Sequence, residues 1–258
     1  SIQNGTTIAD WDEDEHGRQM SLSGSICNAS WDGRKVNLLD TPGDAGFVAD
    51  SIAALRVTET ALIVVNGVTG IEVQTGRQWA RADAIGRSRL VFVNMLDRDR
   101  ADFDMVVASL QEQLAPQCVP LAIPTGSEQS LSGVIDVLHE RAFSTDDEGK
   151  ETPTDISADE ADRVAAAREQ LVEAVVETDE AVMERYLEGE EIGAEELLGE
   201  LRARRRRRVP PAQELDKIAA RPLQPQLDLR VAEPRGQRVR AVLVAAEHLV
   251  QPRVGRLH

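Results

Sequence analysis

The chain alternates short apolar runs with stretches in which apolar residues recur at the spacing of a helix. Runs typical of strands lie at residues 26–31, 35–39, 61–66, 88–94 and 119–124, and helical spacing occurs at residues 47–57, 72–86 and 101–114. A regular alternation of strands and helices is typical of a mostly parallel sheet. The pattern therefore predicts an α/β fold with helices on both faces of the sheet.

Two local signals refine this picture. Asp32-Gly33 separates the first two apolar runs and favours a β-hairpin. The runs at 61–66 and 88–94 are almost continuously apolar, as expected for strands that are buried on both faces. We therefore expect a hairpin followed by a buried parallel pair.

The pattern changes near residue 145, after which the chain becomes acidic and helical. Residues 158–188 predict a long amphipathic helix, and a second helix is expected near 193–203. The expected buried stripe of the first helix consists of Val164, Leu171, Val172, Val175 and Val176. We divide the chain into residues 1–144, a helical unit at 145–201, and a tail at 202–258.

Charge separates the tail from the rest of the chain. The net charge is -16 overall, but residues 1–200 carry -25 and residues 201–258 carry +9. One interpretation is a basic tail that binds ribosomal RNA, and the one we prefer is a tail translated out of frame from a GC-rich gene. Under either interpretation we expect residues 202–258 to be poorly ordered, because they have little apolar surface to bury.

Composition narrows the class of protein. Apolar residues make up 41% of the chain and aromatic residues only 3%, so a core must be mainly aliphatic. Taken by itself, the net charge of -16 argues against a protein that binds nucleic acid. Cys27 and Cys118 lie in apolar runs without metal-ligand spacing, which predicts two reduced core cysteines. No apolar run approaches the roughly 18 residues of a membrane helix.

The sharpest chemical signal is Asp40-Thr41-Pro42-Gly43, directly after the second apolar run. An aspartate at a strand end can hold Mg²⁺ through water. Gly43 lacks a Cβ, so its N–H could approach a γ-phosphate closely. The alternative is an ordinary type I turn with proline at its second position.

A second signal is Asn94-Met95-Leu96-Asp97, at the end of the run 88–94. GTPases recognise guanine with Asn-Lys-x-Asp, whose aspartate accepts two hydrogen bonds from the base. Met95 stands where that motif has lysine, and Asn94 and Asp97 could instead be simple caps of the strand end. In a doubly wound sheet both signals fall at the carboxyl edge, where ligands bind.

Several segments resemble elongation factor G and its elongation-factor-G-like paralogues in bacteria. They are GTTIADWDEDE, SLSGSICNASWDGRKVNLLDTPGDAGFVADSIAALRV, VNGVTGIEVQTGRQW, VFVNMLDRDRADF, IPTGSEQSLSGVIDVL and MERYLEGEEI. The resemblance covers about residues 4–202. It implies a doubly wound GTPase domain with a helical inserted subdomain, which uses GTP and Mg²⁺. It also implies a cytoplasmic, monomeric protein that acts on the ribosome and has no membrane or DNA partner.

The resemblance assigns roles to individual residues. Arg18-Gln19-Met20-Ser21 matches switch I, where the family has a threonine that ligates Mg²⁺, so Ser21 becomes a metal ligand. Asp40 and Gly43 match the switch II positions for Mg²⁺ and the γ-phosphate. Asn94 and Asp97 match the positions that recognise guanine.

The chain departs from the family at four places. No Gly-x-x-x-x-Gly-Lys occurs in its 258 residues, so we expect the first strand and the phosphate-binding loop to lie upstream of Ser1. Asp44 stands where the family has a catalytic histidine, and Met95 replaces lysine. The Ser-Ala loop expected after the insertion is not recognisable.

Three functional hypotheses follow. The first is a GTPase by resemblance, expected to be inactive in the form of this chain. The second is a truncated or degenerate product that binds no nucleotide and serves at most as a protein-interaction module. The third is another translational GTPase, such as a peptide release factor or a tetracycline-resistance ribosome-protection protein. The segments that resemble the inserted subdomain favour the elongation factor G branch.

Overall fold

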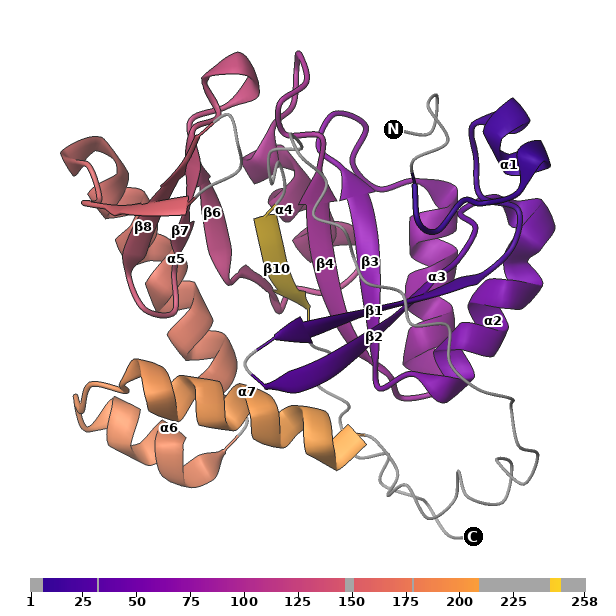
Figure 1. The fold of residues 1–258 in the computed structure, drawn as a ribbon. Coiled ribbons are helices and arrows are strands. Elements are labelled where there is room, and N and C mark those ends of the chain that lie inside the picture. Colours follow the sequence, from indigo (N-terminus) through magenta and orange to yellow (C-terminus); the bar gives the residue numbers. More distant parts are fainter. Residues whose placement is uncertain (1–6, 32, 147–150, 178, 209–241, 247–258) are drawn as a thin grey trace, which may run out of the picture.

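A computed structural model describes residues 7–31, 33–146, 151–177, 179–208 and 242–246. Within these ranges the chain forms a β-hairpin, a four-stranded sheet with helices packed against it, a second four-stranded sheet and three further helices (Figure 1). No helix in this part of the chain is both long enough and apolar enough to cross a membrane.

The hairpin consists of β1 (Ser25–Trp31) and β2 (Arg34–Asp40), which pair along their whole length in an antiparallel register. Gly33 has φ of 68° in the connecting turn, a conformation that glycine adopts without steric cost. The predicted hairpin is therefore confirmed. A short helix, α1 (Glu13–Arg18), precedes it, and a 3₁₀ turn, η2 (Ala45–Phe47), leads from it into α2 (Val48–Val57).

The next two strands, β3 (Thr60–Asn66) and β4 (Ser88–Asn94), are parallel and joined by α3 (Val73–Ala84). Ile63, Val65 and the β4 residues opposite them lie on one buried face. On the other face of β3, Leu62 and Val64 remain 49% and 55% exposed. Burial on both faces was thus a wrong expectation for β3, since among the described residues no helix fully covers this second face.

Two further strands complete the first sheet. β5 (Cys118–Pro120) follows α4 (Phe103–Gln113). β10 (Val242–Ala246) lies between β4 and β5, antiparallel to both, and Figure 1 shows it in yellow beside β4. We expected poor order throughout 202–258, so this strand is a correction. Its physical reason is that a five-residue apolar run lies between two strands whose backbone groups it can pair. The rest of the tail lies largely outside the described residues.

The second sheet is antiparallel and follows chain order. It consists of β6 (Ala122–Thr125), β7 (Gly133–Asp136), β8 (Arg141–Thr145) and β9 (Glu151–Thr154). Only Leu121 separates β6 from β5, so the single strand expected at 119–124 is two strands in different sheets. The boundary expected at residue 145 falls at the end of β8, within this sheet. We call β6–β9 and the helices that follow them the inserted unit.

Three helices follow this sheet: α5 (Ala158–Val176), which contacts β5 of the first sheet, and α6 (Glu180–Leu187) and α7 (Ala194–Arg208), which both contact α5. The single long helix expected at 158–188 is broken, because the Asp179 carboxylate accepts from the N–H groups of Ala181 and Val182 and starts a new helix. The expected buried stripe of α5 is confirmed, except that Val172 is only partly buried. Helix α7 extends to Arg208, five residues beyond the segment expected.

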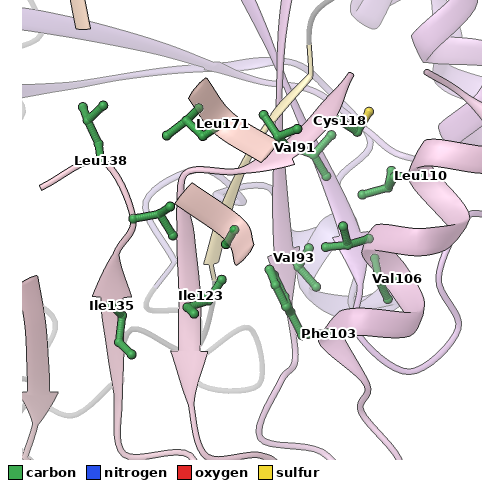
Figure 2. Close-up of a cluster of buried hydrophobic side chains, with 14 of the residues drawn as sticks. Val91, Val93, Phe103, Val106, Leu110, Cys118, Ile123, Ile135, Leu138 and Leu171 are labelled. Atoms are coloured by element: carbon green, nitrogen blue, oxygen red, sulfur yellow. The ribbon is translucent and has the colours of Figure 1, made fainter. Parts of the chain in front are cut away.

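One continuous hydrophobic core joins the two sheets (Figure 2). Val91 and Val93 of β4 lie close to Val106 and Leu110 of α4, and the cluster continues through Ile123 and Ile135 to Leu171 of α5. Each such side chain contributes about 1.5–3 kcal/mol when fully buried. The core is mainly aliphatic, as the composition predicts.

Candidate functional site

The segment before β1 is organised around one buried carboxylate. Glu15 is 1% exposed. Its Oε2 accepts from the N–H groups of Trp11 and Asp12, each at 3.2 Å, and its Oε1 from those of Leu22 at 2.9 Å and Ser23 at 3.1 Å. These backbone hydrogen bonds, led by that from Leu22, hold the pKa of Glu15 below its ordinary value despite burial. Glu15 therefore ties the two ends of this segment together.

The same segment places Ser21 against Asp10, whose charge acts on Asp40 at the end of β2. The Ser21 hydroxyl donates to Oδ1 of the buried Asp10 at 2.7 Å. The surrounding protein removes part of the hydration of Asp40, which raises its pKa, and the charges of Asp10 and Glu15 raise it further. Asp10 thus links the two sequence-predicted metal residues, because its carboxylate accepts from Ser21 and its charge acts on Asp40.

Gly43 and Asp44 lie in the loop after Asp40, the first with open space around it and the second with its side chain hydrogen-bonded. A Cβ on Gly43 would meet no protein atom within 4 Å, so packing within the protein does not require glycine there. Asp44 caps η2, with its Oδ1 accepting from the Gly46 N–H at 2.7 Å. Asp44 therefore caps a 3₁₀ turn that leads into α2, and not the α-helix itself.

A second group of site residues lies at the ends of β3 and β4. Asn66 and Asn94 stand opposite each other at the last position of the parallel register. The Asn94 side chain accepts from the Met95 N–H at 2.9 Å, and its carbonyl accepts from the Gly67 N–H at 2.7 Å. A Cβ on Gly67 would lie 3.0 Å from that carbonyl oxygen and 3.0 Å from Leu96 Cδ2. Close contact between the two loops therefore favours glycine at position 67, because a Cβ there would crowd the Asn94 carbonyl.

The loop after β4 has an uncommon backbone. Met95 and Arg100 have φ of 59° and 67°, and neither is glycine. Asp97, the residue predicted to recognise guanine, is partly buried between them, and Met95 is 40% exposed. Backbone of this kind occurs mainly where surrounding contacts impose it, often at functional sites.

The structure reveals two residues that the sequence-based assignment missed, Asp10 and Glu15. Asp10 receives the Ser21 hydroxyl, and Glu15 fixes the segment that carries it. One signal for Glu15 was available. Asp12 and Glu15 have the spacing of a capping box, and both of its hydrogen bonds are present in α1. Asp10 lies in an acidic stretch whose composition does not distinguish it from its neighbours.

The residues near Asp40 are compatible with Mg²⁺. Among the described residues no group of three or more His, Cys, Asp or Glu is placed to hold a metal ion. Mg²⁺ does not need such a group, since it commonly keeps several waters and takes one or two protein ligands together with substrate phosphates. The oxygens of Ser21 and Asp40 are of the type it prefers.

Comparisons with known proteins identify the family to which the chain is similar. Residues 1–221 match the family model described as "Elongation factor Tu GTP binding domain". The chain is 37% identical over 193 residues to an elongation factor G-like protein of Thermotoga maritima, an alignment that covers 75% of this chain and 28% of the relative. A crystal structure from Thermus thermophilus is similar with a TM-score of 0.74 and 32% identity, over 80% of this chain and 31% of that one.

The chain thus spans less than a third of the length of these two relatives. The family match covers most of the chain and includes Ser21, Asp40, Asn94 and Asp97. It agrees with the predicted α/β nucleotide-binding fold and with a GTP-binding role in translation. The chain belongs to the translational GTPases that carry the elongation factor Tu GTP-binding domain, on their elongation-factor-G-like branch.

Proposed function

We propose that this chain provides the guanine-recognition and switch elements of an elongation-factor-G-like GTPase that couples GTP hydrolysis to a ribosomal step. The observation that carries the proposal is the loop after β4, where Asn94 bonds the neighbouring loop and Asp97 lies partly buried between two residues of positive φ. This loop stands at the carboxyl end of a parallel strand pair, the usual position of a nucleotide site.

In the proposed site Asp97 selects the base. Its carboxylate accepts from the guanine N1–H and exocyclic amine, and adenine does not offer that pair of donors. Asn94 keeps the loop in place through Gly67. Met95 packs its thioether side chain against the base, which replaces the apolar part of the usual lysine but not its charge.

The phosphate side of the proposed site consists of Ser21, Asp40 and Gly43. Bound Mg²⁺ would neutralise charge on the phosphates. Ser21 would offer its hydroxyl oxygen to the metal, Asp40 would hold the metal through water, and Gly43 would offer its N–H to the γ-phosphate. Because a Cβ at Gly43 would contact no protein atom, this position leaves space for a ligand.

Hydrolysis by this site should be slow. Asp44 stands where the family has histidine, and its Oδ1 already accepts from the Gly46 N–H. Two like charges about 4 Å apart repel by roughly 4 kcal/mol at an effective dielectric of 20, so a carboxylate turned toward the γ-phosphate would oppose the transition state. We propose that Asp44 acts as a cap and does not orient the attacking water.

The remaining features of the proposal follow from the family. We propose the ribosome as the partner, the cytoplasm as the location, and a monomer that contacts neither DNA nor membranes. A second candidate function is a non-catalytic protein-interaction module. These 258 residues contain no Gly-x-x-x-x-Gly-Lys. Phosphate cradling supplies several bonds of about 1.5–3 kcal/mol each, so we expect this chain by itself to bind a guanine nucleotide with a millimolar or weaker dissociation constant.

A titration that follows backbone amide resonances can detect binding this weak. GDP with Mg²⁺ should shift the resonances of Asn94 and Asp97 at lower concentration than ADP does. Asp97→Ala should abolish this difference between the two nucleotides, whereas the neighbouring exposed Asp99→Ala should preserve it. If the wild-type chain responds equally to GDP and ADP, guanine recognition at this loop is wrong and the non-catalytic function is favoured.

A further inference from the structure

The loop after β4 is held on both sides of Asp97 by one residue from outside the loop. The Glu128 N–H donates to the Leu96 carbonyl at 3.0 Å, and Glu128 Oε1 accepts from the Arg100 N–H at 2.6 Å. Asp97 lies between these two contact points. Glu128 therefore spans residues 96–100 with one backbone and one side-chain hydrogen bond.

The backbone on both sides of this contact is strained. Met95 and Arg100 have positive φ at the two ends of the loop, and Glu128 itself has φ of 51°. Non-glycine residues keep such conformations only where the surrounding structure imposes them. The loop and Glu128 thus impose conformations on each other, and neither is expected to keep its shape alone.

Glu128 belongs to the inserted unit rather than to the nucleotide-binding sheet. It opens a 3₁₀ turn, η3 (Glu128–Ser130), between β6 and β7. The Ser130 hydroxyl holds this turn by donating to the Ser127 carbonyl at 2.7 Å and accepting from the Ser127 N–H at 3.2 Å. Gly126 precedes it with φ of 77°, and a Cβ there would lie 2.2 Å from the Ser130 carbonyl oxygen. The turn therefore presents Glu128 in a fixed orientation.

We propose that Glu128 is a positioning residue for guanine recognition, through which the inserted unit controls the loop that carries Asp97. Glu128 acts on the base only through the loop, and it is not a catalytic residue. The inference rests on the proposed function for the identity of the base. The contact itself and its effect on the loop are independent of any ligand.

Such a coupling acts in both directions. If the inserted unit holds the loop in the form that binds guanine, a guanine nucleotide on the loop must stabilise the turn at 126–131 to the same extent. A partner that displaces the turn at 126–131 from the loop would weaken base binding by the same factor. The turn connects the paired strands β6 and β7, so a movement of these two strands would also move the turn.

Hydrogen exchange of the chain provides the test. Removing the side chain in Glu128→Ala should speed exchange of the Arg100 N–H about tenfold or more, the factor expected for losing one bond to a charged acceptor. Glu128→Gln keeps an oxygen that can accept from Arg100 and should restore most of the protection. Glu140→Ala is a matched control, because Glu140 is a second glutamate of positive φ in the inserted unit and its side chain is exposed.

The second measurement is the nucleotide titration. Glu128→Ala should reduce the preference for GDP over ADP, and Glu128→Gln and Glu140→Ala should retain it. Unchanged exchange at Arg100 in Glu128→Ala, or unchanged preference with faster exchange, overturns the inference. Equal binding of GDP and ADP by the wild-type chain, together with faster exchange in Glu128→Ala, overturns the proposed function while the control of the loop by Glu128 stands.

Discussion

Replacing Glu15 with glutamine should loosen the whole segment that carries Ser21. The carboxylate accepts four backbone N–H groups while almost fully buried. A glutamine side chain has one oxygen and one NH₂ group, so two of the four N–H donors would face another donor. Each bond to a charged acceptor contributes about 1.5–3 kcal/mol. We therefore expect a loss of about 3 kcal/mol in the free energy that keeps this segment closed.

Amide hydrogen exchange measures this opening directly. A change of about 3 kcal/mol corresponds to slightly more than a hundredfold faster exchange at the N–H groups of Trp11, Asp12, Leu22 and Ser23. Glu13→Gln is the matched control, since Glu13 lies two residues away on α1 and is exposed. Its exchange rates should stay within about twofold of wild type, the scale of ordinary surface substitutions.

The same bonds predict a pH dependence. The pKa of Glu15 is held below its ordinary value of 4.5, so its ionised form stabilises the folded segment. This stabilisation is complete above about pH 4.5 and is lost as pH falls through the lowered pKa. Glutamine does not ionise in this range, so Glu15→Gln should remove this contribution. If the four amides exchange equally in wild type and Glu15→Gln at neutral pH, Glu15 does not hold the segment.

Two further predictions concern packing and thiol chemistry. Gly67→Ala should lower the urea midpoint by the equivalent of about 1–3 kcal/mol, because the added Cβ crowds the Asn94 carbonyl. Gly76 lies in the interior of α3 with open space around it, so Gly76→Ala should raise the midpoint by the equivalent of up to about 1 kcal/mol in the free energy of unfolding. Equal effects of the two substitutions would contradict this reasoning. Burial raises the pKa of Cys118 to about 12, so at pH 8 a thiol reagent should modify the partly buried Cys27 in the native chain and Cys118 only after denaturation. Rapid modification of both in the native chain would refute this.

The elements that could be predicted from sequence are those with a strong local pattern. The hairpin has a turn dipeptide between two apolar runs, and β3 and β4 are nearly continuous apolar segments. The second sheet lacked such a signal, because β7, β8 and β9 have only four or five residues each. The exposure of one face of β3 and the pairing of β10 are tertiary outcomes that a local pattern does not contain.

The candidate site divides in the same way. Asp40, Asn94 and Asp97 follow apolar runs in short motifs, so their positions at strand ends could be inferred. Asp10 could not, since it bonds a hydroxyl eleven residues away. The role of Glu128 was even harder to predict from the sequence, because its partners Leu96 and Arg100 lie about thirty residues earlier, in a loop of the other sheet.

Leu121 makes the connection between the two sheets very short. It is the single residue between β5 and β6, and its carbonyl accepts from the Val137 N–H at 3.0 Å. One residue spans at most about 3.3–3.6 Å, so the two sheets have almost no slack between them. A pull on the inserted unit of more than a few ångströms would have to strip pairs from β5 or β6. The junction is therefore rigid, so a rotation of the inserted unit would be passed to the first sheet. A longer linker would let the two sheets move independently.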